Sequence, residues 1–328
     1  MDNGANNPRT MPQAHAESLG PSLDAPQQPA ISLSPWKRLC QNKGALVSLW
    51  VLVIITSLGI FGPIFFPEEY TQTSEKQFSP PSLGHPLGTD LNGRDLFYRV
   101  LSGARVSLVV GLSGAAISLV IGTVYGMVSG YVGGRVDALM MRVVDVLYAI
   151  PRLIFVLILI NAFDSSIKDT LSAVLGSDSR VISFSKTIVL VVALGLIEWL
   201  TMARIIRGQV LSLKSRQFVT AACALGQSHT RIIFIHLLPN ILGIAITYLT
   251  LTIPAVILDE SFLSFLGLGI EEPLASWGSL LNDGRSVINP VNSFWWLLAF
   301  PAIAMSLTLL ALNFLGDGLR DLFDPRQK

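Results

Sequence analysis

Three ionisable residues, Asp145, Arg152 and Glu198, lie inside long apolar stretches of this sequence. Charged side chains at membrane depth are costly, so they often mark a transport pathway or an ion pair between helices. Asp145 and Arg152 are about 10 Å apart along a straight helix, too far for a direct pair, although Pro151 would bend that helix. Arg152 and Glu198 are therefore candidates to line a polar cavity, to pair across helices or to extend to the membrane surface. Asp145 belongs to the same pathway or to the cytoplasmic interface.

The sequence offers little for covalent catalysis. Its four histidines, His15, His85, His229 and His236, show no H-E-x-x-H or similar metal-ligand spacing, and its acidic residues are scattered. It has no G-x-x-x-x-G-K-[ST] loop that could hold a nucleotide phosphate. We expect no catalytic residue, no metal and no cofactor in this chain.

The composition indicates a membrane protein. Of 328 residues, 51% are hydrophobic and only 14% are charged, which is too little polar surface for a soluble globule of this size. We expect an all-α polytopic fold, because about 20 apolar residues form a helix that crosses the bilayer. Six stretches qualify: Ala45 to Phe66, Val106 to Val132, Val143 to Phe163, Thr187 to Ala203, Leu237 to Leu258, and Val291 to Gly316.

The distribution of Lys and Arg predicts the orientation. Counted between these six spans, about twice as many basic residues fall on the side of the N-terminus as on the other side. Both termini are therefore expected in the cytoplasm, with the chain multi-pass in a bacterial inner membrane. Cys40 and Cys223 then both lie on the cytoplasmic side, where thiols stay reduced. The net charge of +1 suggests no nucleic-acid partner.

Four regions follow from this topology. Residues 1–35 form a disordered cytoplasmic tail, 36–66 a basic anchor with the first span, 67–105 an outer segment, and 106–328 a core of five spans with a cytoplasmic loop at 204–240. The outer segment holds Asp90, Arg94 and Asp95, close enough for a local network of ion pairs and turns, or simply an ordinary loop. In the second span, Gly122, Gly126 and Gly130 share one helix face and predict close packing on another helix or on a second subunit.

The stretch "TAACALGQSHTRIIFIHLLPN", residues 220 to 240, is neither a span nor a simple loop. A helix can end at Gly226, which tolerates a left-handed backbone, and Ser228 can cap a second helix that Pro239 limits. This predicts two short helices joined at a glycine elbow beneath the bilayer. The small Ala221 and Ala222 would let a partner dock against the backbone.

At this stretch the sequence resembles the permease subunits of binding-protein-dependent ABC importers. The spacing of Ala221-Ala222, Gly226 and Leu238-Pro239 is similar to their cytoplasmic coupling signature, with Thr220 where the general pattern has Glu and His236 where it has Ile. A His at that position is typical of the peptide and nickel subgroup. Further segments resemble the C-type subunit of that subgroup: "HPLGTDLNGRDLFYRVLSGARVSL", "GYVGGRVDALMMRVVDVLYAIP", "LDESFLSFLGLG" and "ASWGSLLNDGR". The resemblance extends from about Pro35 to the C-terminus, with an outer loop at 164–186 longer than the family's.

The resemblance implies a subunit that conducts and couples but does not bind ATP. Its partners would be a homologous second permease, two ATP-binding subunits and an external substrate-binding protein. The residues implied in ATPase coupling are Thr220, Ala221, Ala222, Gly226, His236, Leu238 and Pro239. Peptides are the expected cargo. The alternatives are nickel or another small solute in the same architecture, and a secondary active transporter, for which the internal repeats typical of that class are missing.

Overall fold

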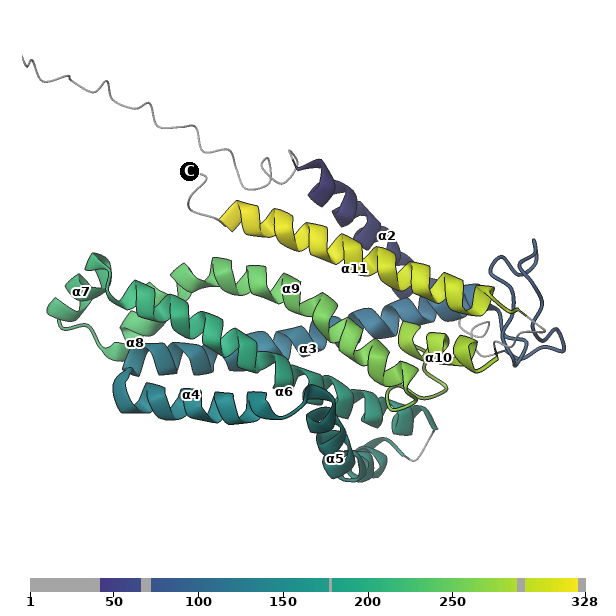
Figure 1. Cartoon of the computed structure of the whole chain (residues 1–328), viewed down its shortest axis with the longest axis horizontal. Coiled ribbons are helices and arrows are strands. Elements are labelled where there is room, and N and C mark those ends of the chain that lie inside the picture. Colours follow the sequence, from purple (N-terminus) through teal and green to yellow (C-terminus); the bar gives the residue numbers. More distant parts are fainter. Residues whose placement is uncertain (1–41, 66–71, 177–178, 288–292, 324–328) are drawn as a thin grey trace, which may run out of the picture.

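The computed structural model describes residues 42–65, 72–176, 179–287 and 293–323 (Figure 1). Within these ranges the regular structure is helical, apart from an isolated bridge between Thr89 and Asp95. The helices are α2 (Lys43–Phe65), α3 (Leu96–Val132), α4 (Gly134–Ala149), α5 (Arg152–Leu175), α6 (Ser179–Lys214), α7 (Gln217–Ala224), α8 (His229–Arg231), the π-helical turn η1 (Ile232–Leu237), α9 (Leu238–Phe265), α10 (Trp277–Val287) and α11 (Trp296–Phe323).

Five described helices are long and apolar enough to cross a membrane, and α4 with α5 would make a sixth if that bent pair is one span. This confirms an all-helical protein with five to six candidate spans. The expected span from Val143 to Phe163 is not one continuous helix, because the chain turns by 93° between α4 and α5, and the bend expected at Pro151 is confirmed. Pro151 explains the break: it lacks an N–H, and it holds the preceding Ile150 in an extended conformation.

Helix ends differ from the expected boundaries in three places. Helix α3 begins at Leu96, so residues 96–105 are helical. Helix α6 continues as far as Lys214, so the cytoplasmic loop expected from residue 204 begins later. The supposed outer loop at 164–186 is mostly helix, since α5 continues to Leu175 and α6 begins at Ser179. Apolar windows miss such extensions because the helices continue beyond their hydrophobic parts.

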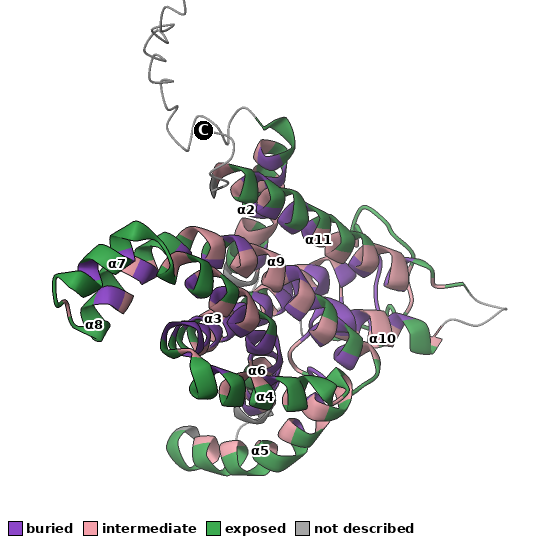
Figure 2. Cartoon of the chain, turned by 60° about the vertical axis from the view of Figure 1, so that its left-hand side comes forward, coloured by how far each residue is buried: buried purple, intermediate pink, exposed green. Residues whose placement is uncertain are grey.

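The centre of the molecule is the contact between α3 and α6, which is close because α3 presents glycines to α6. A Cβ atom at Gly122 would lie 2.6 Å from the Cβ of Met202, and one at Gly126 would lie 2.5 Å from the carbonyl oxygen of Ala203. The glycine face therefore packs within the chain. Figure 2 shows buried residues concentrated on α3, α6 and α9, whereas α4 and α5 are mostly exposed.

A network of ion pairs lies at the end of the molecule that carries α10. Asp90 Oδ2 accepts from Arg94 Nε at 2.8 Å and from Arg99 Nη1 at 2.7 Å, so the expected Asp90–Arg94 pair is confirmed. Asp95 instead caps α3 and contacts His85. Arg94 also donates to Glu272 at 2.7 Å, and this hydrogen bond lowers the pKa of that carboxyl. The network joins the segment before α3 to the segment before α10.

Candidate coupling loop and translocation pathway

The predicted glycine elbow is present between α7 and α8. Gly226 has a φ of +72°, its N–H donates to the Cys223 carbonyl oxygen at 3.0 Å, and the Gln227 N–H donates to that of Ala222 at 3.2 Å. Both bonds use carbonyl groups that the end of α7 leaves free. Ser228 accepts from the Arg231 N–H at 3.4 Å, which confirms it as the cap of the next helix.

The second half of the elbow is not a separate short helix. The chain passes from α8 through η1 into α9, so one helical segment continues from His229 to Phe265. Pro239 directly follows the π-helical turn η1, where the regular α-helical hydrogen bonding is already interrupted, and it does not limit the helix as expected. His236 Nε2 lies 2.8 Å from Gln227 Oε1, which joins η1 back to the elbow.

The elbow is fastened to the ends of two other helices. Tyr131, at the end of α3, places its hydroxyl 2.8 Å from His229 Nδ1. Lys214, at the end of α6, donates to the Tyr131 carbonyl oxygen and lies over its ring. The elbow is therefore connected directly to the central α3–α6 pair, so a displacement of the elbow would also act on the ends of these two helices.

The expected coupling residues divide by exposure. Thr220, Ala221, Gly226 and Pro239 are exposed, His236 and Leu238 are half-buried, and Ala222 is buried in the core below α7. Of the alanine pair, only Ala221 can face a partner. Leu225, next to the elbow glycine, is 80% exposed.

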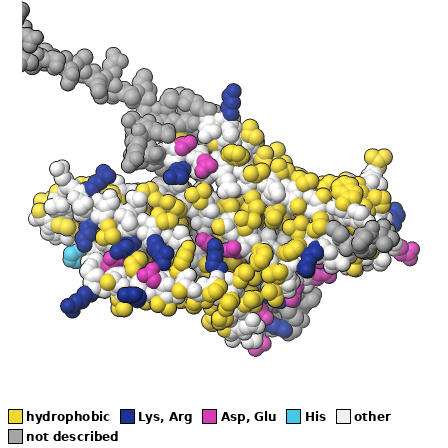
Figure 3. Space-filling model, viewed as in Figure 1, with side chains coloured by type: hydrophobic (Ala, Val, Ile, Leu, Met, Phe, Trp, Pro, Cys, Tyr) yellow, Lys and Arg dark blue, Asp and Glu magenta, His cyan; other side chains and the backbone are white. Residues whose placement is uncertain are grey.

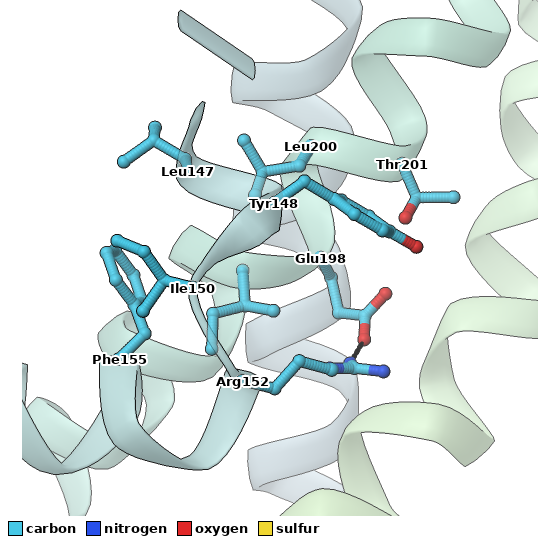
Figure 4. A pocket seen from close by; sticks show the side chains of 9 residues that line it. Leu147, Tyr148, Ile150, Arg152, Phe155, Glu198, Leu200 and Thr201 are labelled. Atoms are coloured by element: carbon cyan, nitrogen blue, oxygen red, sulfur yellow. Dashed lines mark hydrogen bonds and ion pairs between the residues drawn. The ribbon is translucent and has the colours of Figure 1, made fainter. Parts of the chain in front are cut away.

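The second candidate site lies at the bend between α4 and α5 (Figure 4). Arg152 Nη2 donates to Glu198 Oε1 on α6 and, at 2.6 Å, to Asp259 Oδ2 on α9. The structure therefore brings Arg152 and Glu198 together across helices, one of the arrangements that the sequence left open. A hollow of about 90 Å³ beside them is lined by Leu147, Tyr148, Ile150, Arg152, Phe155, Ile197, Glu198, Leu200 and Thr201.

Asp145 belongs to a separate pair on the same side of the molecule. It accepts from Arg204 Nη2 at 2.8 Å, and the Arg204 guanidinium stacks 4.4 Å from the centre of the Tyr148 ring. Farther along α4 and α6, Asp137 accepts two hydrogen bonds from Arg207. Figure 3 shows basic and acidic side chains together on the face that carries α4 and α6.

Sequence reasoning missed two carboxylates of α9. Asp259 completes the contacts of Arg152, and Glu260 is fully buried, with Ser264 Oγ at 2.7 Å and the hydroxyls of Ser107 and Ser261 at 3.3 Å. Both lie in "LDESFLSFLGLG", and the cost of charge within an apolar helix was the signal that could have identified them. No group of metal ligands occurs among the residues that the structure describes.

Comparison with known proteins identifies the family. Residues 122–328 match the family model "Binding-protein-dependent transport system inner membrane component". The chain belongs to this family. Residues 34–81 match the N-terminal TM domain of oligopeptide transport permease C.

Its relatives cover nearly the whole chain. It is 43% identical to the dipeptide transport system permease protein of Bacillus subtilis, over 92% of this chain and 89% of that protein. It is 44% identical to the oligopeptide transport system permease protein of Haemophilus influenzae, over 89% and 88%. The corresponding Escherichia coli K12 protein is 43% identical, over 89% and 90%.

Membership of this family decides between the two transporter classes that the sequence left open. The chain is a multi-pass inner-membrane permease component of a binding-protein-dependent ABC transporter, not a secondary transporter. Such a component works in complex with an ATPase and a binding protein, and it is not the catalytic subunit.

Proposed function

We propose that this chain is one of two homologous permeases in an importer of di- or oligopeptides, and that two ATPases drive it through the elbow between α7 and α8. An external binding protein delivers the peptide. The peptide cargo is inferred from the names of relatives at about 40% identity, which are dipeptide and oligopeptide permeases. No observation favours nickel.

The observation that carries the coupling role is the exposure of the elbow together with its continuity into α9. At Gly226 an added Cβ would meet no atom of this chain within 4 Å, so this side of the elbow is open to a partner. Such a partner can approach closely at Ala221, whose side chain is small, and can make an apolar contact with Leu225; both residues are exposed. Because Thr220 stands where the family pattern has Glu, docking here rests on shape and apolar contact rather than on that carboxylate.

The same proposal fixes the orientation. An ATPase binds on the cytoplasmic side, so the elbow lies in the cytoplasm and the network around Asp90 lies outside. Both termini are then cytoplasmic, as the distribution of Lys and Arg predicts. The proposal places residues 72–95 on the outer side and residues 215–240 in the coupling region; the tail expected at residues 1–35 lies outside the described residues.

Substitution of Gly226 by Asp tests this proposal. The tagged chain is purified in mild detergent from native membranes, and co-purifying proteins are identified by mass spectrometry. Wild type is expected to recover a second permease and two ATPases. Gly226→Asp should insert normally but lose the ATPases and peptide uptake, because it places a charged side chain in the docking surface.

Gly267→Asp is the matched control. Gly267 also has a positive φ, +77°, open space around it and the same pair of hydrogen bonds to the end of the preceding helix, but it follows α9 at the end opposite the elbow. Both substitutions therefore introduce similar backbone strain, of about 1–2 kcal/mol. Normal uptake by Gly226→Asp, or equal loss in the two variants, would refute the coupling assignment.

A further inference from the structure

The contacts of Arg152 leave its two carboxylate partners short of positive charge. One guanidinium nitrogen, Nη2, serves both Glu198 and Asp259. Within the described ranges, neither carboxylate has a second basic partner. Asp137 and Asp145, by contrast, each have an arginine to themselves. With all three groups ionised, the triad of Arg152, Glu198 and Asp259 carries a net charge of −1.

The triad is too exposed to face lipid. The side chain of Arg152 is 52% exposed in this chain and that of Asp259 is 29% exposed, while Glu198 is near the middle of the apolar stretch Phe184–Lys214. Charged side chains at that depth face a water-filled cavity or another protein segment, because exposure to hydrocarbon is costly. This face of α5, α6 and α9 is therefore the side on which an aqueous pathway can run.

Arg152 and Glu198 of the triad also line the small hollow, which has room for one group of a peptide. Tyr148 and Thr201 direct hydroxyl groups toward the side of Glu198, whereas Phe155 and Ile150 supply an apolar wall (Figure 4). An apolar wall with a few polar groups is the usual lining of a small binding pocket, in which the polar groups fix the orientation of what binds. Charge is the property of the cargo that this site can distinguish.

We propose that the triad binds cationic side chains of the peptide in transit, and that it favours cationic over anionic peptides. Asp259 is the main contact, because it is the more exposed carboxylate, and Arg152 holds it in place. The inference rests on the proposed function, since it assumes a peptide as cargo. It adds the residues that meet the cargo inside the membrane and the chemistry by which they do so.

Charge-dependent uptake tests this inference. The complete complex is reconstituted in liposomes with its binding protein, and uptake is measured for three tripeptides of equal length with net charges of +1, 0 and −1. For each peptide, the variant rate is divided by the wild-type rate, which cancels the preference of the binding protein. Asp259→Asn removes the excess negative charge and should lower the ratio for the cationic peptide relative to the anionic one by about fivefold to tenfold.

Two further variants sharpen the test. Glu198→Gln removes the same unit of charge from the other side of Arg152 and should shift the preference in the same direction. Asp169→Asn makes the same chemical change at an exposed position on α5 and should leave all three ratios near one. A shift in preference is a readout that a merely structural role of the triad would not produce.

The outcomes separate the two proposals. Equal losses for the three peptides in Asp259→Asn and Glu198→Gln, whether partial or complete, would overturn the binding role of the triad and leave it as a structural clasp. Unchanged ratios would overturn it as well. If the wild-type complex moves no peptide at all while hydrolysing ATP, the proposed function itself fails, independently of the triad.

Discussion

Asp259 and Glu260 are neighbours on α9 but have opposite environments. Asp259 faces the open triad, whereas Glu260 is completely buried and has serine hydroxyls around it. Ser107 belongs to α3 and also accepts from the Trp277 N–H at the start of α10. Glu260 on α9 is therefore linked to α3 and α10 through the Ser107 hydroxyl, which indicates a structural role.

Replacing Glu260 by Ala should destabilise the protein. The change leaves buried serine hydroxyls without their acceptor, at a cost of about 1–3 kcal/mol for each group left unsatisfied. We expect a lower thermal midpoint in detergent, followed by size-exclusion chromatography after heating. Glu260→Gln keeps an acceptor oxygen and should lose less. Glu75→Ala, at an exposed position, is the control; an unchanged midpoint in Glu260→Ala would contradict the joining role.

Sequence alone could identify only part of each site. The cost of charge in a membrane singles out Arg152 and Glu198 without any structure, and the backbone freedom of glycine singles out Gly226. The cost of charge could also have singled out Asp259, but its contact with Arg152 could not be predicted, because the two residues are 107 positions apart in the chain and meet only through the packing of α5 and α9 on α6. The burial of Ala222 beneath α7 depends on tertiary contacts in the same way.

The close contact between helices α3 and α6 depends on the glycines of α3, which have no side chain to hold the helices apart. At Gly126 an added methyl group would meet the backbone oxygen of Ala203, which cannot rotate away. Gly126→Ala should therefore force the helices apart and lower the free energy of unfolding by about 1–3 kcal/mol, as overpacking does elsewhere. A lower thermal midpoint of unfolding for the purified variant than for wild type would show this loss of stability.

Gly208 on α6 gives a matched comparison. A Cβ atom there would meet nothing within 4 Å in this chain, so Gly208→Ala should be neutral or slightly stabilising, since Ala favours a helix. If both alanine variants unfold at the wild-type midpoint, close packing at the glycine face is not what holds α3 against α6.

The presence of the long helices could be predicted from the sequence, but the residues at which they end could not. Apolar stretches located the spans because the bilayer requires about 20 such residues. Residues 204–214 carry several basic side chains, so hydropathy ends the span before α6 itself ends at Lys214. Likewise Pro151 indicated a bend, but only packing of α5 on α6 sets its angle.

The proposed orientation of the whole molecule can be read from one cysteine. Cys223 lies on the exposed side of α7 as a free thiol. In a Cys40→Ser background, expressed without ATPases, a membrane-impermeant maleimide should label Cys223 in inside-out vesicles and not in right-side-out vesicles. Gln77→Cys in a chain without other cysteines is exposed on the opposite side and should show the reverse pattern. Labelling of Cys223 only in right-side-out vesicles would invert the topology.

The helical segment from His229 to Phe265 connects the elbow to the triad, because Asp259 lies thirty residues along it. The segment contains the π-helical turn η1 and Pro254, and both are places where a helix bends. Asp259 is held to Arg152, on another helix, by a hydrogen bond of 2.6 Å. Under the proposed coupling, an ATPase that moves the elbow would change the bend of this segment, separate Asp259 from Arg152 and release what the triad holds.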